Sequence, residues 1–209
     1  MQLYERLGVP CGVTAVIGSG GKTTLLRTLS RELPGTVILT TTTHILPFEG
    51  VPLLTAPTED EVRAALARSR VLCLGTPAPE GKLTAPSLPF SLLEQLADYV
   101  LVEADGSRRL PLKAHAPHEP VIPKEADCVL CVVGAHGFDR PIREAVHRPE
   151  QFCTLTGARL DEPASPALAA RALAAEGFTQ TIVLTGASEK QRSAFSAAAQ
   201  QYGLRVISI

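Results

Sequence analysis

The sequence has no tryptophan and one methionine, and aromatic residues make up only 4% of its 209 residues. It also lacks any apolar run near the roughly 20 residues that a membrane-spanning helix needs. Lysine and arginine number 20 against 21 acidic residues, and both signs are mixed along the chain. Because nucleic acids and anionic membranes attract clustered positive charge, we expect neither nucleic acid nor membrane as a partner.

The N-terminal sequence, MQLYER, lacks the charged and then apolar layout of a signal peptide, so we expect a cytoplasmic protein. The chain has five cysteines, an odd number. We expect them to behave as small buried hydrophobic residues. They are Cys11, Cys73, Cys128, Cys131 and Cys153.

Short apolar runs rich in β-branched residues alternate with helical patterns along the chain. The runs predict seven strands, at residues 13–17, 36–40, 71–74, 99–102, 128–133, 181–184 and 204–207. Because the runs are apolar on both faces, they favour a parallel sheet covered on both sides. Helices are predicted at residues 22–33, 59–68, 89–97, 166–176 and 189–202. Two proline-rich stretches, residues 76–87 and 111–124, are expected to be irregular.

Several predicted strands end in a glycine or an acidic residue. These residues are Gly18, Gly75, Asp105, Gly134 and Gly186. Since the carboxyl ends of parallel strands line the ligand crevice of an open sheet, we expect the functional residues at this edge.

A glycine-rich segment, GSGGKTT at residues 18–24, joins the first predicted strand to the first predicted helix. Its members are Gly18, Ser19, Gly20, Gly21, Lys22, Thr23 and Thr24. Glycines let successive backbone N–H groups point inward, and the helix N-terminus adds partial positive charge, which together suit phosphate. Lys22 would reach the β and γ phosphates, and Thr23 would ligate Mg²⁺. The full Walker pattern needs glycine where this chain has Val16, so the loop is a variant.

A second motif is the acidic end of the strand predicted at residues 99–102. Glu103 and Asp105 are two residues apart, so on a strand they share one face and could address the same Mg²⁺. We assign Asp105 to the metal and Glu103 to positioning or general-base work, and the reverse assignment stays open. Solvated carboxylates at an exposed strand end are the alternative.

Further polar residues follow the second, fourth and fifth predicted strands. Thr42, Thr43 and His44 are placed to sense a γ-phosphate, although threonines also favour plain extended structure. Arg108 would offset charge that develops on a transferring phosphate, as Lys113 also could. His115 and His118 could bind a substrate or a metal. Arg140 and His147 are the other candidates for substrate contact, and their alternative role is surface ion pairing.

These features predict an α/β fold: a P-loop NTPase-like three-layer sandwich, with a mostly parallel sheet of about seven strands flanked by helices. We expect a single domain over residues 1–209. The strand at residues 181–184 is followed by TGAS, which has no carboxylate to accept the guanine N–H pair. ATP is therefore favoured over GTP as the nucleotide that binds with Mg²⁺.

Four segments resemble the selenium-dependent hydroxylase accessory proteins of the YqeC type: GSGGKTT, TTTTH, VEADGSRRLPLKAHAPHEPVIP and VHRPE. The resemblance covers roughly residues 14–150. It implies a nucleotide loop at residues 18–24 and an acidic block at Glu103 and Asp105. It also implies a role in the maturation of selenium-dependent molybdenum hydroxylases, with the hydroxylase or its cofactor-loading machinery as a partner.

The expected activity is Mg-dependent nucleotide binding, with hydrolysis or transfer of the γ-phosphate. Lys22 and the loop amides would hold phosphates, while Thr23 and Asp105 would hold Mg²⁺. One alternative is a nucleotide-gated adapter or cofactor-delivery protein with little turnover of its own. Another is a small-molecule kinase, whose acceptor would lie among the histidines and Arg140. Whether the chain forms a homodimer stays open.

Overall fold

The structure is a computed structural model that describes residues 1–209. The chain forms two compact units, each assembled from three segments. The first unit contains Met1–Val16, Thr23–Asp105 and Val121–Cys128, and the second contains Ile17–Lys22, Gly106–Pro120 and Val129–Ile209. The prediction of a single domain over residues 1–209 stays a prediction.

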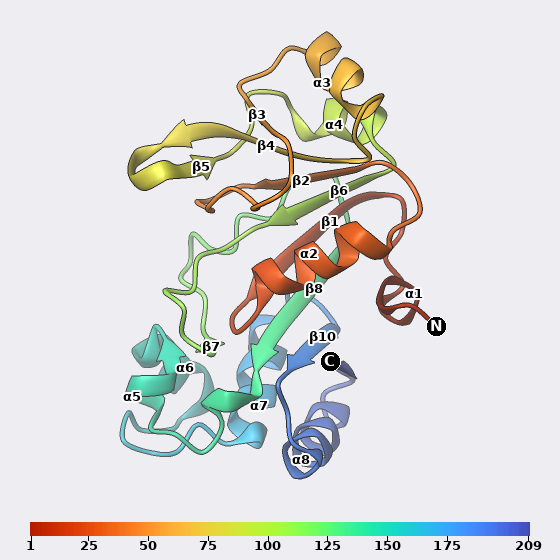
Figure 1. The fold of residues 1–209 in the computed structure, drawn as a ribbon. Helices are drawn as coiled ribbons and strands as arrows, with labels where there is room; N and C mark the ends of the chain where they lie inside the picture. The colour runs from red at the N-terminus through yellow and green to blue at the C-terminus, as the bar shows by residue number, and fades with distance from the viewer. The chain divides into compact units, whose positions relative to one another are not determined.

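The first unit is built on parallel strands. Their hydrogen-bonded order is β1 (Gly12–Gly18), β6 (Tyr99–Glu103), β2 (Val37–Thr41), β4 (Val71–Ala78) and β3 (Leu53–Thr55), as Figure 1 shows. The short strand β5 (Lys82–Thr84) runs antiparallel to β4. In register, Glu103 lies opposite Val16 of β1 and Thr41 of β2, which places this carboxylate between two neighbouring strand ends.

Helices cover the strands of the first unit. They are α1 (Leu3–Leu7), α2 (Lys22–Glu32), α3 (Glu59–Leu66) and α4 (Phe90–Leu96). Val62 of α3 and Leu93 of α4 join a buried apolar cluster with Val100 and Val102, which are alternate residues on one face of β6. Helix α2 crosses in front of β1 in Figure 1. Every residue of β2 and β6 is buried, which agrees with strands covered on both faces.

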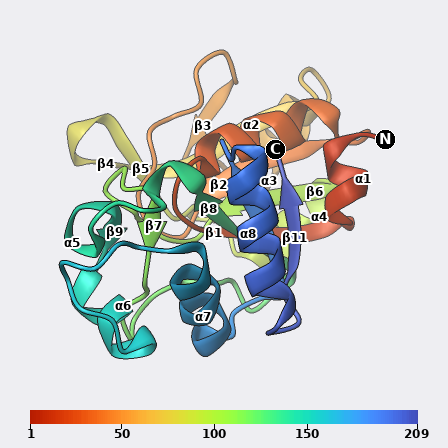
Figure 2. The same cartoon turned by 90° about the horizontal axis from the view of Figure 1, so that it is seen from below.

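The second unit has its own parallel strands, in the order β8 (Ala126–Gly134), β10 (Thr181–Thr185) and β11 (Arg205–Ser208). A separate parallel pair joins β7 (Leu112–Lys113) to β9 (Val146–His147). The helices are α5 (Ile142–Ala145), α6 (Pro149–Thr156), α7 (Pro166–Glu176) and α8 (Glu189–Gln200). Helix α8 packs against both β11 and α7, as Figure 2 shows.

The predicted fold class is confirmed. All seven predicted strands are present, as β1, β2, β4, β6, β8, β10 and β11, and all five predicted helices are present, as α2, α3, α4, α7 and α8. The chain is therefore an α/β protein of mostly parallel strands flanked by helices. None of its helices combines the length and apolar character needed to cross a membrane.

Two expectations were wrong in part. Residues 76–87 are not wholly irregular, because β4 continues to Ala78 and turns back into β5, with Thr76 opposite Thr84. This pairing involves alternating half-buried residues rather than an apolar run, so periodicity did not reveal it. Cys11 is exposed and Cys128 and Cys153 are half-buried, so only Cys73 and Cys131 fit the expectation of buried cysteines.

Candidate functional site

The glycine-rich loop adopts a backbone that glycine favours. In the second unit, φ is 87° at both Gly18 and Gly20 and 133° at Gly21. A Cβ atom on Gly20 would lie 2.5 Å from the Cα of Gly134, and one on Gly18 would collide with the carbonyl oxygen of Val132. Both positions therefore exclude a side chain by conformation and by space.

Three other segments of the second unit anchor this loop. The Ser19 N–H donates to the carbonyl of Val132 in β8 at 2.8 Å, and the Ser19 hydroxyl donates to the carbonyl of Leu110. The hydroxyl of Thr185, at the end of β10, donates to the Gly20 carbonyl at 2.5 Å. The loop is thus held from both sides by hydrogen bonds.

Lys22, the first residue of α2, is turned back on the loop. Its side-chain Nζ donates to the carbonyl oxygen of Gly18 at 2.6 Å, and the residue is only 4% exposed. An ammonium group beside a glycine-rich turn at a helix N-terminus is an arrangement that binds phosphate oxygens.

The first unit brings the hydroxyl of Thr23 to an acidic side chain. Thr23 Oγ1 donates to Oε2 of Glu103 at 3.2 Å. Thr23 and Thr24 are both exposed, Glu103 is 9% exposed and Asp105 is completely buried. A hydroxyl and a carboxylate oxygen are hard ligands of the kind Mg²⁺ takes, so this pair fits the ion. This hydrogen bond joins Thr23 to Glu103, the residue that the reverse assignment places at the metal, and both assignments stay predictions.

The threonines after β2 are tied to neighbouring backbone. The hydroxyl of Thr41 donates to the Glu103 carbonyl at 2.7 Å, and the hydroxyl of Thr42 donates to the Val121 carbonyl at 2.6 Å. The Thr43 N–H donates to Thr41 Oγ1 at 2.9 Å. His44 is exposed. These contacts hold the segment beside the end of β6, while a ligand role for Thr42, Thr43 and His44 stays a prediction.

In the second unit, Lys113 and Arg148 share one carboxylate. Lys113 Nζ lies 2.9 Å from Oε2 of Glu119, and Arg148 Nη2 lies 3.1 Å from Oε1. Lys113 also donates to the Gly106 carbonyl at 2.5 Å. Burial raises the pKa of Glu119, but the hydrogen bonds and charges of Lys113 and Arg148 outweigh this effect, and the net pKa lies below its usual value.

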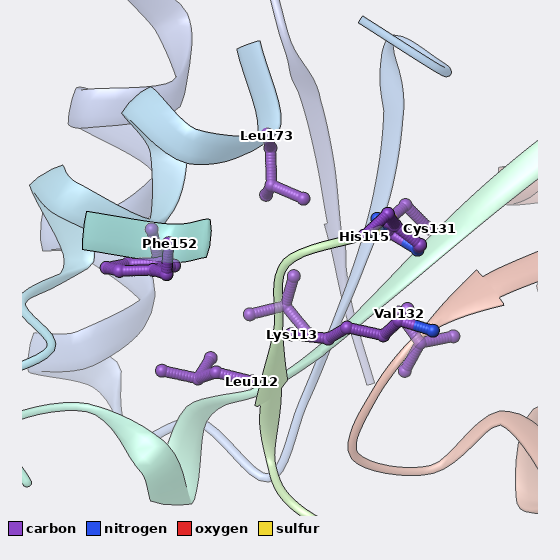
Figure 3. A pocket seen from close by; sticks show the side chains of 10 residues that line it. Leu112, Lys113, His115, Cys131, Val132, Phe152 and Leu173 are labelled. Carbon is purple, nitrogen blue, oxygen red and sulfur yellow. The ribbon is translucent and has the colours of Figure 1, made fainter. Parts of the chain in front are cut away.

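His115 is held inside the second unit. Its ring nitrogen Nδ1 lies 2.9 Å from Oε2 of Glu176, and its backbone N–H donates to Oε1 of the same carboxylate at 2.6 Å. Its ring meets the edge of Phe178 with 5.1 Å between centroids. His115 and Lys113 line a cavity of about 10 Å³, which leaves room for roughly one water molecule. Figure 3 shows the two side chains beside it. These contacts hold His115 against Glu176 and Phe178, and its role in substrate contact stays a prediction.

His147 lies beside the ion pairs that Lys113 and Arg148 form with Glu119. It is opposite Lys113 in the β7–β9 pair and is 9% exposed. Burial lowers the pKa of His147, and the positive charges of Lys113, Arg148 and Arg108 lower it further, against the opposing effect of Glu119. The lowered pKa favours the neutral form of the His147 imidazole over the charged form at pH 7.

The structure gathers only some of the predicted substrate residues. Lys113 and His147 lie together, whereas His118 and Arg140 are exposed and His115 faces Glu176. Sequence reasoning missed Thr185 and Glu176 as partners. The end of a predicted strand could have indicated Thr185, but no local signal pointed to Glu176 at the end of α7.

The fold and the loop together define an α/β protein whose first strand passes through a glycine-rich turn into a helix. The family model described as YqeC protein matches residues 14–150, and the chain belongs to the YqeC family. The uncharacterized protein YqeC of Escherichia coli (strain K12) is 37% identical over 155 residues, which is 69% of this chain and 60% of that relative. The chain thus spans less than two thirds of its relative's length. No solved structure matches it.

Proposed function

We propose that the chain binds a Mg-nucleotide through residues 18–24 and uses it in an accessory step of selenium-dependent molybdenum hydroxylase maturation. One observation carries the nucleotide part: the ammonium of Lys22 folds onto the Gly18 carbonyl, 2.6 Å away, within a loop of glycines in left-handed conformations. A phosphate would take the place of that carbonyl as the partner of Lys22.

The side chains divide the work of binding and positioning. Lys22 and the loop N–H groups hold phosphate oxygens, and the hydroxyl of Thr23 with the carboxylate of Glu103 holds the metal. When bound, Mg²⁺ supplies positive charge that neutralises the phosphates. Asp105, which is buried two residues after Glu103, would orient metal-bound water. Arg108 would offset the charge that develops on the transferring phosphate.

The residues after β10 support ATP as the nucleotide. Thr185 donates to the Gly20 carbonyl, and Ser188 caps α8 by accepting from the Gln191 N–H. The segment between them contains no acidic residue, and a carboxylate is the group that would accept the guanine N–H pair.

Family membership supports an accessory role. The partner that we propose for this role is a hydroxylase or its cofactor-loading machinery. The accessory role has two possible forms, which differ in how fast the chain hydrolyses nucleotide by itself. A nucleotide-gated adapter would hydrolyse slowly alone and faster with its partner, whereas an independent hydrolase or phosphotransferase would be unaffected by that partner.

Thermal unfolding with Mg-ATP and with Mg-GTP tests nucleotide binding. At a ligand concentration of a hundred times Kd, binding adds about 2.7 kcal/mol, or about 5 to 11 °C in Tm for a chain of this size. We expect the shift with Mg-ATP, its loss in Lys22→Ala, and its retention in Lys190→Ala, which changes an exposed lysine of α8.

Two results would contradict nucleotide binding at residues 18–24. If the folded protein shows no shift with either nucleotide, the proposal fails. If the shift survives in Lys22→Ala, nucleotide binds elsewhere than at the loop.

A further inference from the structure

A histidine side chain lies beside the glycine-rich loop in the second unit. His136 follows β8 and is the middle residue of a short helical turn, Ala135–Gly137. A Cβ atom on Gly134 would lie 2.9 Å from Cε1 of His136 and 3.0 Å from the Cα atom of Gly20. The imidazole and the middle of the loop therefore border the same point, where residue 134 has no side chain.

The edge of the imidazole that faces this point is its polar edge. Cε1 is the ring carbon that joins the two nitrogens, so both nitrogens are one bond away from the atom that lies nearest to the loop. An imidazole carries at least one N–H donor in either protonation state. His136 is exposed, and its ring makes no hydrogen bond or ion pair with the rest of the chain. Its donors are therefore available to a ligand.

The turn that carries His136 is fixed on both sides. Ala135 is completely buried, and its carbonyl accepts a hydrogen bond from Nε2 of Gln191 at 3.2 Å. Gly137 is buried against Pro111, whose Cγ atom would lie 2.7 Å from a Cβ atom at residue 137. His136 is thus the exposed residue between two buried ones, and a fixed backbone holds a side chain within a narrow range of positions.

The glycine-rich loop is anchored by the same strand and the same proline. The Pro111 carbonyl accepts from the Gly134 N–H at 2.9 Å, and it would lie 2.9 Å from a Cβ atom on Gly20. The Ser19 N–H donates at 2.8 Å to the carbonyl of Val132, two residues before Gly134 in β8. Since one scaffold holds both the loop and the turn, a phosphate group bound by the loop would lie within reach of the imidazole.

We propose that His136 donates a hydrogen bond to a phosphate oxygen of the nucleotide bound at residues 18–24. This contact rests on the proposed function, because it needs a phosphate group held by the loop. It adds a donor from the end of β8 to those of Lys22 and the loop N–H groups. A hydrogen bond to a charged oxygen is stronger than one between neutral groups, so His136 contributes to affinity for the phosphates rather than for the base.

Titration calorimetry with two ligands, Mg-ATP and Mg-tripolyphosphate, tests the contact. Tripolyphosphate has a chain of three phosphates, as ATP does, but lacks the adenosine. His136→Phe keeps a flat ring and removes both nitrogens, whereas His136→Gln keeps an N–H donor. The matched control is Gln200→Ala, which changes an exposed residue at the end of α8 in the same unit.

We expect His136→Phe to weaken the binding of Mg-ATP and of Mg-tripolyphosphate by the same factor, about tenfold. His136→Gln should recover part of this loss with both ligands, and Gln200→Ala should change neither affinity. Because residue 136 is exposed, the substitutions leave the core intact. Circular dichroism and Tm without ligand confirm that each variant is folded.

Three results would overturn the proposal. Unchanged affinity for both ligands in His136→Phe would show that the ring nitrogens do not contact phosphate. A loss for Mg-ATP with none for Mg-tripolyphosphate would place the imidazole at the nucleoside instead. Equal losses in His136→Phe and His136→Gln would attribute the effect to the shape of the side chain. In each case, binding of Mg-ATP by the wild type leaves the proposed function standing, whereas a wild type that binds neither ligand would refute that function and this contact with it.

Discussion

Strands β2 and β6 of the first unit and residues 111–115 of the second are all buried, but different interactions hold them in place. The first unit packs fully buried aliphatic side chains such as Val13, Ile38 and Leu72 into one cluster. The second segment buries Lys113 and His115, each against a carboxylate.

Buried aliphatic side chains and buried ion pairs affect stability in different ways. Aliphatic packing stabilises in proportion to the area removed from water and tolerates other residues of similar volume. A buried ion pair contributes little net stability, and each member becomes costly when its partner is lost. The polar segment is therefore the less tolerant region, and it is where we place substrate binding.

The largest effect is expected from the aliphatic cluster. Leu72→Ala leaves a cavity at a completely buried position, so the free energy of unfolding should fall by about 3–5 kcal/mol. Urea denaturation measures this loss. The control Leu46→Ala, at a residue that is 54% exposed, should change stability by less than about 0.5 kcal/mol. Equal losses in both variants would contradict the assignment of Leu72 to the core.

The next effect should come from the ion pairs. Glu119→Gln removes a carboxylate that pairs with the buried ammonium of Lys113, which should cost about 2–3 kcal/mol, since Glu119 is partly exposed. The double variant Lys113→Met/Glu119→Gln should recover part of the loss, because the buried charge is gone. Urea denaturation of both variants measures the difference. A double variant less stable than the single one would show that packing, rather than charge, dominates here.

A smaller effect is expected at the link between β10 and the loop. Thr185→Val keeps the shape of the side chain but removes the donor to the Gly20 carbonyl, so Mg-ATP affinity should fall about tenfold. Thr185→Ser retains the hydroxyl and should restore most of the affinity. Titration calorimetry measures both values. If serine and valine weaken binding equally, the methyl group, not the hydrogen bond, positions the loop.

The smallest effect concerns acid stability. The pKa of folded His147 lies below its usual value of 6.5, so the unfolded chain binds the proton more readily. The free energy of unfolding should therefore keep its full value above pH 6.5 and decrease as the pH falls through the pKa of the folded state. Urea midpoints measured along a pH series should show a shallower decline in His147→Gln than in the wild type. A decline of equal slope in His147→Gln and in the wild type would contradict this role of His147.

Local patterns were sufficient to predict most of the framework. The buried strands β1, β2 and β6 are continuous apolar runs, and α3 and α8 begin with capping boxes that use nearby residues. The shape of residues 18–24 was also predictable, since its glycines occupy backbone conformations that depend on residue type.

Contacts between distant segments were not predictable. His115 and Glu176 are separated by 61 residues, and nothing in the pattern of either segment indicates the other. The strand period of two placed Glu103 and Asp105 on one face, but β6 ends at Glu103, so the alternation does not extend to Asp105. Whether Glu103 or Asp105 contacts Thr23 therefore depends on the residue at which β6 ends.

The amino-acid order alone therefore settles the α/β class, the seven strands that are apolar runs and the glycine-rich turn, because apolar periodicity and glycine conformations act over a few residues. The folded chain settles which charges share Glu119, which hydroxyl contacts the Gly20 carbonyl and which charges lower the pKa of His147. Those outcomes depend on burial and on distances between segments far apart in the sequence, since electrostatic energies follow the surroundings of a group rather than its neighbours in the chain.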